Sequence, residues 1–110
     1  MRSDRSDKAL LAEICESIEL IGQYIAGLTP ESFEIDPLRR DATAFRLLMI
    51  GEAAKGLSPA VTERLPDIDW RGMIGLRHRL AHDYGSANFN VLWTTADQDV
   101  PALADALAKL

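Results

Sequence analysis

Hydrophobic positions recur at helical spacing along most of this chain. In the first segment, apolar side chains return every three or four residues, at Leu10, Ile14, Ile18, Ile21 and Ile25. That interval places them on one face of a helix, and the neighbouring glutamates fall largely outside it. No stretch shows the convincing apolar–polar alternation of a half-buried strand. The pattern therefore predicts helices rather than a sheet.

Residues that begin and end helices divide the chain into segments. Gly27 is suited to closing the first helix, because glycine adopts the left-handed conformation readily. Thr29 and Asp36 each precede a proline, which is the order of a capping side chain and a first helical residue. Asp69 is expected to cap the later helix that begins at Trp70. The predicted helices cover residues 7–26, 30–35, 37–55, 59 to just before 66, 70–84 and 89–108.

The amino-acid composition supports the same fold class. Alanine and leucine occur fifteen times each among 110 residues, whereas valine and isoleucine together occur eleven times. Unbranched and small side chains lose little freedom in a helix, and strands favour β-branched ones. We therefore expect a single all-α domain over residues 1–110, a bundle of long and short helices. The last helix should be kinked near Pro101, which lacks a backbone N–H.

The net charge of −5 excludes a protein that binds nucleic acid over its whole surface. Cys15 is the only cysteine, so no internal disulfide can form, and we expect a reducing, cytoplasmic compartment. Cys15 adjoins the apolar stripe of the first helix and is expected to pack there as a small hydrophobic residue. No run of about 18 apolar residues indicates a membrane span.

The segment from Trp70 to Tyr84 holds most of the residues that could perform chemistry. Both histidines and three arginines lie in it: Arg71, Arg77, His78, Arg79 and His82. On an ideal helix, Arg71, His78 and His82 fall on one face. Arg77 and Tyr84 fall on another, largely apolar face, where an arginine needs a partner. That partner is either a carboxylate of this chain or a group at a subunit interface.

Arg77 and His82 are five residues apart, about 140° around an ideal helix. Their side chains would not converge as an i,i+4 pair would. A shared site therefore requires a distorted helix end near His82, or a second subunit. A composite site in a dimer follows from this geometry as one of the two possibilities.

Two simpler interpretations of these residues stay open. The segment could be an ordinary amphipathic helix whose polar residues face water. His78 and His82 also have the spacing of two metal ligands on one helix face. However, the glutamate of a His-Glu-x-x-His motif is missing and no cysteine is nearby, which argues against zinc.

Several short motifs follow one another along the chain. The central motif is Arg-x4-His-x-Tyr, formed here by Arg77, His82 and Tyr84. The other stretches are Ile50-Gly-Glu-Ala-Ala-Lys55, Leu57-Ser-Pro59, Asp69-Trp-Arg71, Ile74-Gly-Leu-Arg77, Leu92-Trp93 and Asp99-Val-Pro101. In this order, and over most of the chain, they resemble the motifs of HEPN-domain proteins, specifically the HepT-like toxins.

The resemblance implies an all-α, HEPN-type homodimer that acts as a ribonuclease without a metal or other cofactor. Arg77 and His82 would be the catalytic pair, brought together across the dimer to cleave tRNA or mRNA. The partner would be a minimal nucleotidyltransferase, the antitoxin of a type VII-like toxin–antitoxin pair. By transferring AMP from ATP to Tyr84, it would silence the toxin.

One residue departs from the family pattern. His78 follows the motif arginine, where relatives commonly carry asparagine or another small polar residue. His78, Arg71 and Arg79 are candidate auxiliary RNA-binding residues. The alternative is a helical module without catalytic activity, which binds a nucleotidyltransferase or RNA through the same motif.

Overall fold

Helices are the regular secondary structure of the chain in the residues that the structure describes. The computed structural model describes residues 6–83 and 89–110, with the side chains of all of these except residues 81–83. The elements are α1 (Asp7–Ile25), α2 (Pro30–Glu34), α3 (Pro37–Gly56), α4 (Pro59–Thr62), α5 (Trp70–Asp83), α6 (Phe89–Thr94), the π-helical segment η2 (Thr95–Asp99) and α7 (Val100–Leu107). The expected all-α class is confirmed.

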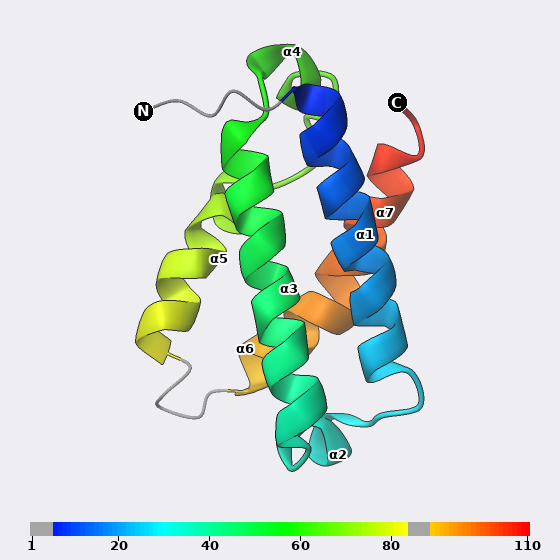
Figure 1. Ribbon diagram of the computed structural model, residues 1–110, viewed down its shortest axis with the longest axis vertical. Coiled ribbons are helices and arrows are strands. Elements are labelled where there is room, and N and C mark those ends of the chain that lie inside the picture. The colour runs from blue at the N-terminus through cyan, green and yellow to red at the C-terminus, as the bar shows by residue number, and fades with distance from the viewer. Residues whose placement is uncertain (1–5, 84–88) are drawn as a thin grey trace.

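Helix α3 is the centre of the bundle. Figure 1 shows α1 and α5 on its two sides, and the chain from α6 to α7 passing behind. The α1–α3 and α3–α5 interfaces are the most extensive. Apolar residues from these helices and from the C-terminal segment meet in one core, which includes Ile14, Ile21, Leu47, Ile50, Leu76, Leu92 and Leu103. This core fixes α5, and therefore the candidate site, against α3.

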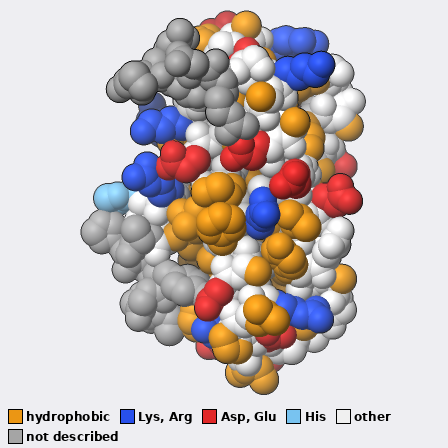
Figure 2. Space-filling model, in the orientation of Figure 1, with side chains coloured by type: hydrophobic (Ala, Val, Ile, Leu, Met, Phe, Trp, Pro, Cys, Tyr) orange, Lys and Arg blue, Asp and Glu red, His pale blue; other side chains and the backbone are white. Residues whose placement is uncertain are grey.

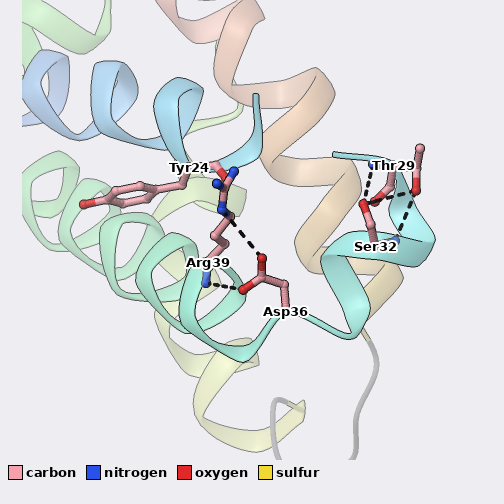
Figure 3. A network of polar contacts seen from close by, with 5 residues as sticks. All are labelled: Tyr24, Thr29, Ser32, Asp36 and Arg39. Atoms are coloured by element: carbon pink, nitrogen blue, oxygen red, sulfur yellow. Dashed lines mark hydrogen bonds and ion pairs between the residues drawn. The ribbon is translucent and has the colours of Figure 1, made fainter. Parts of the chain in front are cut away.

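The predicted helix ends between α1 and α3 are confirmed. Gly27 has φ of 76°, in the left-handed region. Thr29 and Ser32 form a reciprocal capping box at the start of α2 (Figure 3). Asp36 accepts the backbone N–H of Arg39 at 3.2 Å, and the Arg39 guanidinium donates to the Tyr24 carbonyl at 3.4 Å. These contacts tie the end of α1 to the start of α3.

A second polar contact joins the opposite end of the bundle. The carboxylate of Asp7, in the first turn of α1, accepts the Ser58 backbone N–H at 2.9 Å and the Ser58 hydroxyl at 2.6 Å. These two hydrogen bonds favour the charged carboxylate and hold the pKa of Asp7 below its ordinary value. Ser58 precedes the helix predicted from residue 59 and is the N-cap residue of α4, but its side chain binds Asp7 and makes no cap hydrogen bond.

The C-terminal region is divided more finely than one kinked helix. The π-helical segment Thr95–Asp99 ends two residues before Pro101, near which the irregularity was expected. The Val100 N–H donates to the Thr95 carbonyl, five residues back, as in a π-helix. With no N–H of its own, Pro101 cannot continue the ordinary ladder, so the irregular turn is accommodated next to it.

Cys15 is exposed on α1, so the expectation that it packs as a core residue is wrong. It adjoins the apolar stripe, whereas Ile14 and Ile18 carry the contacts with the core. Within residues 6–83 and 89–110, no helix is long and apolar enough to cross a membrane.

Candidate functional site

A close crossing of two helices places Arg77 beside a carboxylate. Gly51 of α3 is buried against α5, and a Cβ atom added there would lie 2.9 Å from the Met73 carbonyl oxygen. Only a residue without a side chain leaves that space free. The short separation brings the next residue of α3, Glu52, against the following turn of α5.

The Glu52 carboxylate pairs with the Arg77 guanidinium. Glu52 Oε1 lies 2.6 Å from Arg77 Nη1, a short charge-assisted contact. The side chains of Arg77 and Glu52 are 59% and 43% exposed. The arginine predicted to need a partner therefore has a carboxylate of this chain, and it lies at the surface rather than within an apolar stripe. A guanidinium has five N–H donors, so this contact leaves others that can bind a phosphate.

Exposed hydrophobic side chains lie on the same two helices. Phe45 of α3 is 52% exposed and Ile74 of α5 is 37% exposed. Figure 2 shows hydrophobic side chains gathered over α3 and α5, with acidic and basic groups around them. The Arg46 guanidinium lies 5.6 Å from the centre of the Phe45 ring. We call Phe45 and Ile74 the α3–α5 apolar patch.

The other predicted site residues are distributed along α5. Arg71, His78 and Arg79 are exposed. His82 belongs to the last turn of the helix, but its side chain lies outside what the structure describes. Tyr84 lies outside the described residues altogether. The described atoms therefore bring Arg77 together with Glu52, whereas the predicted pairing of Arg77 with His82 and Tyr84 involves atoms outside the described part of the chain.

Two features of this region were missed in the sequence. Glu52 lies within the Ile50–Lys55 motif but was given no role, because pairing between α3 and α5 depends on the helix crossing at Gly51. A cavity of about 480 Å³ next to Arg79 was also missed, since its lining comes from segments far apart in the sequence. Among the described residues, no group of three or more potential metal-ligating side chains gathers.

Comparison with known proteins gives a consistent family match. The family model described as "Ribonuclease HepT-like" matches residues 14–110. A Thermococcus cleftensis protein named "Probable ribonuclease HepT" is 36% identical over 106 residues, which cover 96% of each chain. A Methanocaldococcus jannaschii protein with a provisional RNase name is 31% identical over 101 residues, 92% of this chain and 93% of its own.

A third relative, from Caldanaerobacter subterraneus subsp. tengcongensis, also carries a provisional RNase name. It is 28% identical over 106 residues, covering 96% of this chain and 95% of its own. No solved structure matches the chain significantly.

Proposed function

Because this chain belongs to the HepT-like ribonuclease family, we propose that it is a metal-independent endoribonuclease that uses Arg77 and His82. The observation that carries the proposal is the exposed Arg77 guanidinium, which Glu52 holds in place. Arg77 lies on α5, the helix that also contains His82. The match to the family over residues 14–110 supports the reaction class.

The proposed reaction needs a base, a proton donor and a cation. His82 accepts the proton of a ribose 2′-hydroxyl, because a histidine titrates near neutral pH. The 2′-oxygen then attacks the adjacent phosphorus, the bond to the 5′-oxygen breaks, and a protonated group supplies the leaving oxygen with its proton. Arg77 binds the phosphate and stabilises the charge that develops. The products are a 2′,3′-cyclic phosphate and a free 5′-hydroxyl.

Cleavage of purified tRNA and mRNA in the presence of EDTA tests this mechanism. We expect the unmodified protein to cleave RNA, to leave DNA intact, and to lose at least about 100-fold in rate in His82→Ala and Arg77→Ala. Arg39→Ala is the matched control, since Arg39 is also an exposed arginine paired with a carboxylate, but lies at the start of α3. Equal cleavage by His82→Ala and the unmodified protein would contradict the catalytic assignment. Absence of cleavage and of growth arrest by the unmodified protein would favour the binding-module alternative.

We also propose that the active form is a homodimer that joins through the α3–α5 apolar patch. Arg77 and His82 diverge around one ideal helix, so a second copy supplies the complementary residue at each active site. The patch lies on the same two helices as the Arg77–Glu52 pair and contains exposed Phe45 and Ile74. Phe45→Glu should convert the dimer to a monomer in sedimentation analysis, whereas a dimer that persists in this variant would exclude the patch as the interface.

Regulation is proposed to act on Tyr84, in the cytoplasm, through a cognate minimal nucleotidyltransferase antitoxin. The Tyr84 hydroxyl would attack the α-phosphorus of ATP, take AMP and release pyrophosphate. The added phosphate, two residues from His82, would repel RNA and could bind Arg77. Mass spectrometry of the chain coexpressed with its antitoxin should find AMP on Tyr84. AMP on another residue, with Tyr84 unmodified, would contradict this assignment.

A further inference from the structure

A cavity of about 480 Å³ opens on a different face of α5 from the Arg77–Glu52 pair. Its walls come from the loop before α5, from α5 itself, and from the η2–α7 segment. Hydrophobic side chains contribute much of the lining, namely Leu65, Ile68, Met73, Leu76 and Leu103. This volume lies within the range of about 300–1,000 Å³ typical of small-molecule sites. The cavity is therefore large enough for a nucleotide.

Both donors and acceptors surround this apolar lining. Basic residues Arg64, Arg79 and Lys109 contribute to it, as do acidic residues Asp67, Asp69 and Asp99. One oxygen of the Asp69 carboxylate accepts the Gly72 N–H at 2.9 Å and so caps α5. The presence of several carboxylates argues against a simple inorganic anion, because like charges repel. A nucleotide fits both kinds of group, because its phosphate can bind a basic side chain and its base can donate hydrogen bonds to a carboxylate.

The π-helical segment shapes one wall of the cavity. Thr95 and Asp99, the first and last residues of η2, both line it. The Thr95 hydroxyl donates to the Val91 carbonyl at 2.8 Å, so its hydrogen is already used. π-Helical turns are uncommon and often occur at functional sites. Here the wider turn places a carboxylate in the cavity wall, where it can accept a hydrogen bond from a ligand.

Arg79 connects the cavity with the proposed active site. It lines the cavity, and it lies two residues after Arg77 on α5. His78, the residue between them, is exposed. An RNA strand whose phosphate is bound by Arg77 can therefore continue across the exposed face of α5, over His78, to reach Arg79.

We propose that this cavity binds an unpaired base of the RNA substrate, close to the bond that is cleaved. The apolar lining contacts the base, Arg79 binds its phosphate, and Asp67 or Asp99 accepts an N–H from its exocyclic amino group. Carboxylates accept hydrogen bonds from such amino groups in other base-recognition sites. The cavity therefore favours adenine, cytosine or guanine over uracil. This inference rests on the proposed ribonuclease function.

Titration of the full chain with AMP, CMP, GMP and UMP tests the cavity directly, with NMR shifts locating the site. We expect at least one amino-bearing nucleotide to bind more tightly than UMP and to shift the signals of cavity residues. Ala102→Phe, at an exposed position that lines the cavity, should weaken that binding at least tenfold. Ala60→Phe is the matched control, because Ala60 is exposed on α4 and is not part of the lining.

Arg79→Gln gives a second readout on an exposed side chain. It should weaken the nucleotide without weakening the corresponding nucleoside, which lacks the phosphate. The proposal is overturned if none of the four nucleotides shifts cavity residues, if UMP binds as tightly as the others, or if Ala102→Phe binds as the unmodified chain does.

Failure of this inference is distinguishable from failure of the ribonuclease assignment. His82→Ala should lose cleavage and still bind the nucleotide, because the described lining that α5 contributes ends at Arg79. Ala102→Phe should still cleave RNA, with an altered base preference beside the cut. Full cleavage by His82→Ala would refute the catalytic role alone, whereas an unchanged base preference in Ala102→Phe would refute the cavity's role alone.

Discussion

The Arg77 guanidinium contacts the Glu52 carboxylate, and both side chains are exposed to water. An ion pair this exposed contributes at most about 1 kcal/mol to stability. The main effect of this pair is therefore to orient the Arg77 guanidinium, since the carboxylate fixes one edge of it and leaves other donors available. The same carboxylate also competes with a phosphate for Arg77.

Glu52→Gln should separate these two effects on the proposed reaction. We expect a lower KM for RNA, because the competing negative charge is gone, and a lower kcat, because the guanidinium is held less firmly. Steady-state kinetics on a short RNA would measure both constants. The free energy of unfolding should change by less than about 1 kcal/mol. An unchanged kcat would contradict a positioning role for Glu52.

Asp7 gives the fold a dependence on acid pH. Its pKa is held below the ordinary value in the folded state by the two hydrogen bonds from Ser58, so the charged form stabilises the fold. This stabilisation is fully present above the pKa of the unfolded state, and it is lost as the pH falls through the lower, folded pKa. Asp7→Asn should be less stable than the unmodified chain at pH 7.

The difference in the free energy of unfolding between Asp7→Asn and the unmodified chain should shrink as the pH falls below about 4. Urea unfolding at a series of pH values measures it. A difference that stays constant between pH 7 and pH 3 would show that the Asp7 charge does not contribute.

The crossing of α3 and α5 depends on Gly51. A methyl group there would meet the Met73 carbonyl oxygen at 2.9 Å, and a backbone atom cannot move aside cheaply. Overpacking typically costs about 1–3 kcal/mol, partly offset by the better helix propensity of alanine. We expect Gly51→Ala to lower the free energy of unfolding by about 1–2 kcal/mol.

Gly22→Ala is the matched control for that substitution. Gly22 is exposed on α1 and has nothing within 4 Å of an added Cβ atom, so alanine should raise the stability by about 0.5–1 kcal/mol. Chemical denaturation measures both variants. If Gly51→Ala proved as stable as Gly22→Ala, the close helix crossing would be wrong.

Local rules predicted the helices well where the determining residues are neighbours. The caps at Thr29 and Asp36 and the left-handed Gly27 each depend on a few consecutive residues, and all three are present. The pairing of Glu52 with Arg77 could not be predicted in the same way. Residues 25 positions apart meet only because α3 and α5 cross closely, which is a property of the packed bundle.

The roles of the candidate site residues therefore stay predictions, and the structure adds the pairing of Arg77 with Glu52. The sequence indicated that Arg77 needs a partner, and left open whether this chain or a second subunit supplies it. The cavity beside Arg79 could not be predicted as a cavity, because its lining combines the loop before α5 with α7. Its one local indication was Pro101, which marks the irregular turn that forms a wall.

The negative charge of the chain and a function on RNA are compatible. The net charge of −5 describes the surface as a whole, whereas Arg71, Arg77 and Arg79 are grouped on one helix. A dimer would bring two such groups close together and provide a local site for phosphates. The central claim is that each active site combines Arg77 of one copy with His82 of the other.

Mixing two inactive variants tests that claim most directly. Arg77→Ala and His82→Ala are unfolded and refolded together, so that mixed dimers form, and RNA cleavage is measured. Each mixed dimer then retains one complete site, and random pairing predicts about a quarter of the unmodified activity. A mixture no more active than either variant alone would contradict a site shared between two copies.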